Sequence, residues 1–208
     1  EELLSRHARC AEGLARCSQD LLRDRSQSVP THSALAAALE HLRYAVDAEC
    51  AAVYACSSGA LAAALTLVVQ VQAAGSSARY AETLLLPERV QIALEARCSW
   101  GGMAAPHGPP QPGAPTLLLP IHVDGAWWGC LALYRAPAEA AWHPQELQSL
   151  EVAAEMISAF VQSRNNTAAL HRRIAELTAL NQIVQSVTSS GDLRRSLQHV
   201  GVLVRELF

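Results

Sequence analysis

The side chains best suited to chemistry in this sequence are Cys98 and three of the histidines that follow it, His107, His122 and His143. All four could supply soft or borderline ligands to a metal ion. Their spacing matches no zinc pattern, however, and His122 alternates with apolar residues as a strand residue does. We therefore expect ordinary loop and strand histidines and no metal site.

Motifs for nucleophilic or phosphate chemistry are also missing from the sequence. There is no Gly-x-Ser-x-Gly elbow for a serine nucleophile. Gly101, Gly102 and Gly108 do not form a phosphate loop, because no strand pattern leads into them and no Lys-Ser/Thr pair follows. The six cysteines include no Cys-x-x-Cys pair, and reduced cytosolic thiols fit this composition better than disulfides.

The composition predicts one globular domain with additional helices. Of the 208 residues, 50% are hydrophobic and 17% are charged, which favours a packed core over disorder. The net charge of −3, without a basic stripe, argues against nucleic-acid binding. No apolar run reaches the roughly 18 residues of a membrane span. The start lacks Met and any signal-peptide pattern, so we expect an internal piece of a longer cytoplasmic protein.

The elements that would position these groups follow from hydrophobic periodicity. Apolar residues at helical spacing predict helices over residues 1–25, 34–46 and 88–96, and a long helix from Pro144 that continues to about Ser189. Alternation predicts strands over residues 49–56 and 61–72, the second with Leu65, Leu67, Val69 and Val71 on one buried face. Residues 97–115, rich in Gly and Pro, are predicted to be nearly all loop.

The clearest local signal is a β-hairpin. Asp124 and Gly125 separate two strand-forming runs, residues 116–123 and 126–134, and both positions of such a turn require positive φ. Pro120 lies inside the first run, and because proline cannot donate to the ladder it indicates an edge or a bulge there.

The end of the sequence echoes its beginning. Residues 193–204, in a helix that Asp192 would cap, align with residues 35–46 with Leu, Leu, His and Val coinciding. The window is short enough for chance agreement between two amphipathic helices. A true repeat would make the final residues the start of a second module.

Laid end to end, the elements resemble the GAF domain family over about residues 34–162. The likeness is carried by residues 47–54 for the first strand, 118–121 and 129–133 for the hairpin, and 145–150 for the last helix. The resemblance implies an α+β fold of GAF or PAS-like type, with a central antiparallel sheet, helices on one face and long helical extensions at both ends. The expected parts are an N-terminal helical linker (1–30), a sensor domain (31–164), a helical signalling linker (165–190) and the start of a truncated second module (191–208).

The resemblance also implies a ligand pocket on the other face of the sheet, covered by residues 73–115. The residues expected to line it are Tyr54, Val69, Tyr80, Ile92, Cys98, Trp100, Met103, His107 and Trp128. Trp127 and Trp128 must face opposite sides of their strand, so one of them can line a pocket or a dimer surface.

The chemical signatures of the family's subsets are absent. Bilin attachment commonly uses a cysteine followed by histidine, whereas Cys98 is followed by Ser99. Cyclic-nucleotide binding uses an Asn-Lys-Phe-Asp-Glu signature, and this chain contains no lysine. Reduction of methionine sulfoxide needs clustered pocket cysteines, of which the loop region has only Cys98, so the redox pair is missing unless Cys130 turns inward. No haem signature is found either, so the cofactor or ligand stays unknown.

The expected function is a non-catalytic sensory and dimerisation module of a cytoplasmic signalling protein. Binding or packing changes in the pocket would act through the long helix on an effector in the same chain, such as a histidine kinase of a two-component system, a nucleotide cyclase, a phosphatase or a transcription activator. A homodimer would form through a coiled coil of terminal helices. The residues expected on the dimer and signalling helix are Leu150, Ile157, Val161, Leu170, Leu177 and Val184.

Two alternatives remain open at this point. One is a redox sensor or small-molecule enzyme that uses Cys98. The other is a ligand-free dimerisation spacer whose pocket is filled by its own alanine, leucine and tryptophan side chains.

Overall fold

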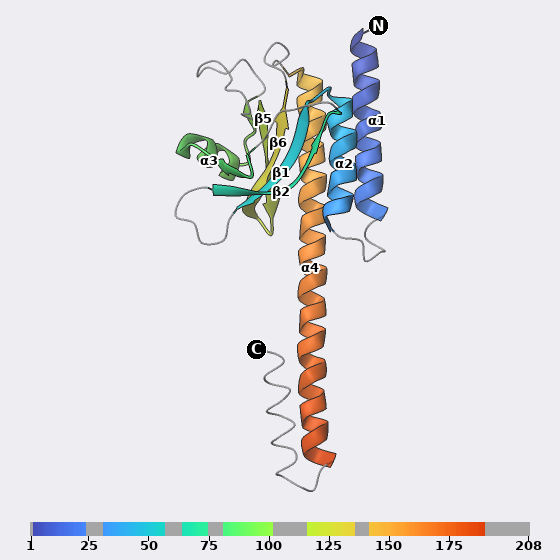
Figure 1. Cartoon of the computed structure of the whole chain (residues 1–208), viewed down its shortest axis with the longest axis vertical. Coiled ribbons are helices and arrows are strands. Elements are labelled where there is room, and N and C mark those ends of the chain that lie inside the picture. Colours follow the sequence, from blue (N-terminus) through green and yellow to red (C-terminus); the bar gives the residue numbers. More distant parts are fainter. Residues whose placement is uncertain are drawn as a thin grey trace. The chain divides into compact units, whose positions relative to one another are not determined.

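The computed structural model describes residues 2–23, 31–56, 64–74, 81–101, 116–135 and 142–189. It divides into two compact units, Glu1–Gln162 and Ser163–Phe208. The first unit contains a six-stranded antiparallel sheet with the strand order β3-β2-β1-β6-β5-β4 (Figure 1). In chain order the elements are α1 (Glu2–Arg23), α2 (Thr31–Ala45), β1 (Cys50–Cys56), β2 (Ala64–Gln72), β3 (Thr83–Leu85), α3 (Glu88–Glu95), β4 (Trp100–Gly101), β5 (Leu117–Val123), β6 (Ala126–Tyr134) and α4 (Pro144–Ser189).

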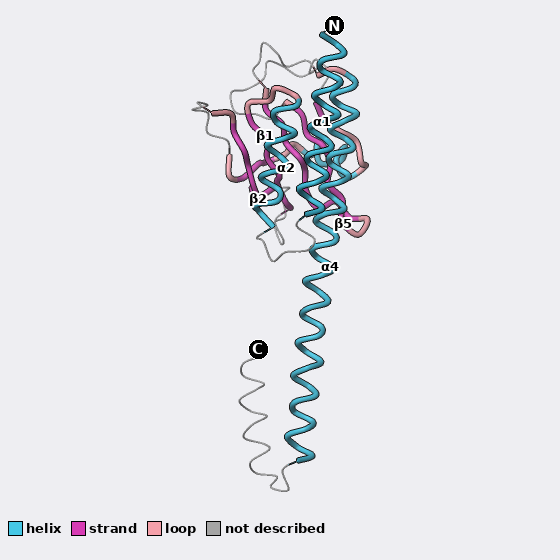
Figure 2. Tube along the Cα trace, turned by 90° about the vertical axis from the view of Figure 1, so that its right-hand side faces the viewer, coloured by secondary structure: helices cyan, strands magenta, loops and turns pink. Residues whose placement is uncertain are grey.

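The two faces of the sheet are covered differently. α1, α2 and the first part of α4 lie on one face, called the helix face below, and α3 lies on the other, called the α3 face (Figures 1 and 2). Because side chains alternate along a strand, Ala51 and Val53 of β1 enter the helix-face core while Ala52 and Tyr54 enter the α3-face core. This arrangement confirms the predicted α+β fold with a central antiparallel sheet.

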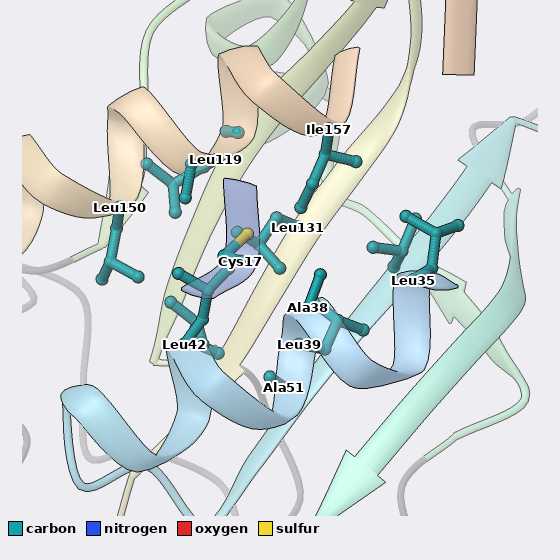
Figure 3. Packing of buried hydrophobic residues seen from close by; sticks show 14 of the residues in the cluster. Cys17, Leu35, Ala38, Leu39, Leu42, Ala51, Leu119, Leu131, Leu150 and Ile157 are labelled. Carbon is teal, nitrogen blue, oxygen red and sulfur yellow. The ribbon is translucent and has the colours of Figure 1, made fainter. Parts of the chain in front are cut away.

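The helix-face core is built from the apolar stripes of the helices. Leu35, Leu39 and Leu42 of α2 point at the sheet, and Leu150 and Ile157 of α4 approach it beside them (Figure 3). The predicted helix over residues 34–46 is thus confirmed, and its stripe packs on the sheet as its spacing indicates.

The predicted hairpin is confirmed at β5 and β6. Asp124 has a φ of 52° and Gly125 a φ of 79°, as a two-residue turn between twisted strands requires. The Gln162 side chain of α4 donates to Asp124 Oδ1 at 2.7 Å, so the turn is also tied to the helix.

Pro120 lies where the outer edge of β5 has no neighbouring strand among the described residues. β4 pairs only with Leu117 and Leu118, so β5 beyond them is paired on the β6 side alone. The N–H of His122 donates to Ser158 Oγ of α4 at 3.3 Å, away from β6. Backbone groups two residues apart point to the same edge, so Pro120 also faces outward, where its missing N–H breaks no ladder bond.

The predicted single buried face of β2 is wrong. Leu65 and Leu67 contribute to the α3-face core, whereas Val69 and Val71 pack against the helix-face core. The cause is a β-bulge in the pairing with β1, which leaves Val68 as an extra residue. One extra residue moves the side chains that follow it to the opposite face.

Two short strands were not predicted. β3 pairs with the start of β2, and β4 pairs with the start of β5 inside the region predicted to be loop. They are three and two residues long, which is too short to show any periodicity in the sequence.

Several predictions fall outside the described residues. These are the pocket candidates Tyr80, Met103 and His107, and the helix over residues 193–208 with its proposed second module. In the part of the chain that is described, no helix is both long and apolar enough to cross a membrane.

Candidate functional site

Two tyrosines meet on the α3 face at the centre of the sheet. Tyr54 of β1 and Tyr134 of β6 lie with their hydroxyl oxygens 3.0 Å apart, and Tyr54 donates to the backbone carbonyl of Ala81 at 2.9 Å. Since the one phenolic proton of Tyr54 goes to Ala81, Tyr134 is the donor between the two hydroxyls. Ala52 and Ala132, a cross-strand pair between them, leave room for the two rings. We call Tyr54 and Tyr134 the tyrosine pair.

The groups around the tyrosine pair are neutral. Burial raises the pKa of both phenols. The hydrogen bond that Tyr134 donates to Tyr54 raises the pKa of Tyr134 further. Burial likewise raises the pKa of Cys50 to about 12 and raises that of Cys130. Desolvation disfavours the charged form of each group, so this floor carries no charge at neutral pH.

Aromatic and aliphatic side chains complete the α3 face. Trp100 and Trp127 pack against its core, together with Val90 and Leu94 of α3. The guanidinium of Arg89 lies 5.8 Å from the centre of the Trp100 ring, which is cation–π distance. Within the described residues the indole N–H of Trp127 has no acceptor. The face is therefore mostly apolar, with neutral polar groups in its floor and the cation of Arg89 over Trp100.

The structure brings only some of the predicted pocket residues together. Tyr54 lies in the buried floor and Trp100 at its side. Ile92 is largely exposed on α3, and Cys98 is exposed just after it. Val69 and Trp128 instead pack against the helix-face core, on the opposite side of the sheet.

A bulge in β6 places Trp128 on the helix face, away from the face on which the pocket was expected. Tyr54 pairs with Cys130, and strict alternation from Cys130 would place Trp128 on the α3 face. The register with β5 shifts between Ile121 and His122, however, and leaves Trp128 as the extra residue. Trp127 therefore takes the α3-face position. Tyr134 was missed as well, although its even spacing from Cys130 places it on the same face.

The cysteines give no support to a pair of reactive thiols. All six are free; Cys10, Cys17, Cys50 and Cys130 are buried, and Cys56 is half-buried. Cys98 is exposed after the C-terminus of α3, where its N–H donates to the Ala93 carbonyl. The described residues also contain no group of three or more His, Cys, Asp or Glu arranged to hold a metal ion.

A shallow cavity of about 490 Å³ lies elsewhere, between α4 and the outer edge of β5. Its polar lining includes Glu151, Glu155 and Ser158 of α4, facing His122 of β5 and the exposed Arg97. None of the predicted pocket residues that the structure describes lines it. It is a polar, open groove, unlike the buried face around the tyrosine pair.

A buried ion pair joins the end of β6 to the start of α4. Arg135 and Glu146 are only 8% and 5% exposed, and both nitrogens of the guanidinium fork lie 3.3 Å from the Glu146 carboxylate. Arg135 also donates to the carbonyl of Val46, just after α2, and stacks 3.9 Å from the centre of the Trp142 ring. Glu146 also accepts a hydrogen bond from the N–H of His143 at 2.9 Å, which caps the helix. We call this cluster the junction.

In the second unit, α4 presents an apolar stripe. Leu170 and Leu177 are 60% and 54% exposed, and Ile174, Leu180 and Val184 are exposed to a similar degree. Leu150, Ile157 and Val161 of the predicted dimer helix are instead buried in the helix-face core of the first unit. Those three residues pack α4 on the sheet of its own chain.

The amino-acid sequence matches the model of a known protein family. The family model described as GAF domain matches residues 30–161, so the chain belongs to the GAF domain family, a family of sensory modules. A comparison with curated protein sequences finds no match.

Solved structures share the fold at low sequence identity. A bacteriophytochrome of the photosynthetic bacterium R. palustris is 10% identical with a TM-score of 0.63, covering 89% of this chain and 45% of its own. The chain thus spans less than half of that protein. A GAF domain of a phosphoenolpyruvate-protein phosphotransferase from Coxiella burnetii is 17% identical, with a TM-score of 0.57. The match covers 78% of this chain and 98% of that domain. A free methionine-R-sulfoxide reductase from Neisseria meningitidis, solved with its substrate, is 15% identical, with a TM-score of 0.58. The match covers 77% of this chain and 93% of the reductase chain.

Proposed function

We propose that this chain is a non-catalytic sensory module that homodimerises through α4 and passes a change at its α3 face to an effector domain of the same protein. The observation that carries the proposal is the exposed apolar stripe on a helix that begins on the sheet and continues without a break for 46 residues. The effector would be a signalling domain such as the histidine kinase of a cytoplasmic two-component system.

The spacing of the stripe supports a two-stranded coil. Leu170, Ile174 and Leu177 follow one another by four and three residues, and the same repeat continues at Asn181 and Val184. A single Asn in such a seam favours two strands in one register at a cost in stability. Each leucine covered by a partner helix stabilises the dimer by roughly 1.5–3 kcal/mol.

The dimer is tested by charge substitution in the seam. Leu177→Glu with Val184→Glu should convert a dimer into a monomer in sedimentation equilibrium, because four carboxylates would face one another. Ala169→Glu with Ala175→Glu adds the same charge outside the seam and should leave the dimer intact. A seam variant that sediments like the parent would refute the coiled-coil part of the proposal.

Sensing on the α3 face is supported by the apolar, uncharged floor around the tyrosine pair and by the family to which the chain belongs. Ligand pockets are mostly apolar, with a few polar groups that set orientation. Native mass spectrometry of freshly purified protein should show a retained small molecule of low charge. Loss of that molecule on Tyr54→Trp would assign it to this face.

A ligand-free spacer is the second candidate function. It is favoured by the complete burial of Tyr54, Leu65 and Leu118, whose side chains already fill the floor of the α3 face. Under this alternative the mass spectrum shows the bare chain and the dimer still forms. The redox alternative has Cys98 as its only exposed thiol.

A further inference from the structure

We infer that Arg135 is a positioning residue that links the tyrosine pair on the α3 face to the first turn of α4. The inference rests on the proposed sensory function, for which it supplies a physical route from the α3 face to the signalling helix. It concerns two consecutive residues at the end of β6, Tyr134 and Arg135, and the contacts that each of them makes.

These two residues serve opposite sides of the sheet. Tyr134 belongs to the α3-face core, where its hydroxyl bonds to that of Tyr54. The next residue, Arg135, sends its guanidinium to the carboxylate of Glu146 and the carbonyl of Val46. The backbone between them is held by the N–H of Glu49, which donates to the Tyr134 carbonyl at 2.8 Å. A displacement of Tyr134 on the α3 face therefore also displaces Arg135 on the opposite side of the sheet.

The junction cannot absorb such a displacement cheaply. Its ion pair is buried, and separating two buried charges leaves each without the hydrogen bonds that compensate for lost hydration. Trp142 lies against the guanidinium and restricts it from the side. Moving Arg135 thus moves Glu146 with it, in preference to breaking the pair.

Glu146 is also part of the helix start. The same carboxylate that binds Arg135 accepts the N–H of His143 and so satisfies one of the unpaired donors of the first turn. The next bonds of that turn are the N–H of Gln145 to His143 Nδ1 and the N–H of Leu147 to the His143 carbonyl. A shift of Glu146 alters the cap. It therefore changes how often the hydrogen bonds of the first turn of α4 open, without unfolding the sheet.

On the α3 face, the hydroxyls of the tyrosine pair can change their hydrogen-bond partners. Tyr54 holds the Ala81 carbonyl and accepts from Tyr134, so a polar group arriving on this face competes for those hydroxyls. Such a ligand would favour one position of the β6 end over another, which is the differential affinity that a population shift requires.

The test measures amide hydrogen exchange in the intact chain and needs no ligand. Tyr134→Phe removes only the donated hydroxyl, and exchange of the Gln145 and Leu147 amides should become at least 5-fold faster. Tyr54→Phe removes the acceptor of the same bond and should act in the same way. The matched control is Thr116→Val. It removes a hydroxyl that donates to the carbonyl of Leu133, which belongs to β6 as Tyr134 does, and it should leave the exchange of both amides unchanged.

A double-mutant cycle identifies Arg135 as the carrier. Arg135→Lys keeps the charge but loses the two-pronged contact with Glu146 and the stacking on Trp142. In that background Tyr134→Phe should no longer accelerate exchange at Gln145 and Leu147. The Nε resonance of Arg135, which a structural role alone would not move, should shift in Tyr134→Phe and keep its position in Thr116→Val.

Three results would overturn the inference. They are unchanged exchange at the first turn in both tyrosine variants, equal acceleration by Thr116→Val, and the same acceleration with and without Arg135→Lys. None of these readouts depends on a bound molecule or on a dimer. A failed ligand search or a monomeric chain would therefore count against the proposed function and leave this result standing on its own.

Discussion

The carboxylate of Glu146 lies 3.3 Å from the guanidinium of Arg135, and both side chains are almost completely buried. These residues are eleven positions apart and belong to the end of a strand and the first turn of a helix. The pair therefore adds a charged contact to the apolar packing that also joins these two elements.

We expect this ion pair to dominate the stability of the junction. Glu146→Gln should lower the free energy of unfolding by about 3–5 kcal/mol, because it leaves a buried guanidinium without its counter-charge. Urea denaturation measures the loss. The exposed pair of Arg173 and Glu176 supplies the control, and Glu176→Gln should change stability by less than about 1 kcal/mol. An equal effect of the two substitutions would contradict the assignment of the junction as a buried, structure-determining pair.

Gly129 in β6 should tolerate substitution poorly. A Cβ there would lie 2.0 Å from the backbone oxygen of Tyr54, which belongs to the neighbouring strand. Gly129→Ala should therefore cost at least about 1–3 kcal/mol by overpacking. Gly125→Ala meets no atom within 4 Å and faces only its positive φ, so about 1 kcal/mol is expected. Thermal unfolding should rank the two variants in this order, and the reverse order would contradict the close approach of β1 and β6.

The buried thiols should make the protein less stable in alkali. Burial raises the pKa of Cys17 and Cys50 to about 12 in the folded chain, from an ordinary value of 9.0. The folded state therefore keeps protons that the unfolded state releases. The stabilisation is complete below pH 9 and is lost between about pH 9 and 12, at roughly 1.4 kcal/mol per pH unit for each thiol.

Substitution separates this effect from other alkaline titrations. Cys17→Ala should flatten the fall in unfolding free energy between pH 8 and 10.5, measured by urea denaturation at each pH. The control is Cys98→Ala, because that side chain is exposed and its removal leaves no cavity. Parallel curves for the parent and Cys17→Ala would show that the thiol does not contribute.

Thiol labelling should distinguish one cysteine from the other five. In the native state iodoacetamide should alkylate Cys98 rapidly, because it alone is exposed, and Cys56 slowly, because it is half-buried. Mass spectrometry of the intact chain should show one added group early and six after denaturation in urea. Rapid native labelling at two or more sites would contradict the burial of the sheet cysteines.

The sequence predicted the elements wherever their length exceeded a few residues. The hairpin around Asp124 and Gly125 was predictable because its turn geometry selects those residue types, and α4 because its spacing persists over many turns. The junction was not predicted. Arg and Glu usually lie on protein surfaces, so their residue types do not indicate that Arg135 and Glu146 are buried. Only the tertiary fold brings them together and buries them.

The candidate site was predicted less well, and the two bulges explain why. A period of two is reliable only while the strand has no extra residue, and Val68 and Trp128 each add one. Val69 and Trp128 consequently lie on the helix face although alternation predicts the opposite. A bulge leaves no clear mark in the composition of a strand, so this error could not have been avoided from the residues alone.

The outer edge of β5 limits the kinds of partner that this module can accept. Pro120 offers no backbone donor there, and the donor of His122 is already taken by Ser158. An incoming strand would find neither of the two backbone donors that it needs along this part of the edge. Recognition on this side of the sheet must therefore depend on side chains, and two copies of the module cannot extend their sheets into one another across this stretch.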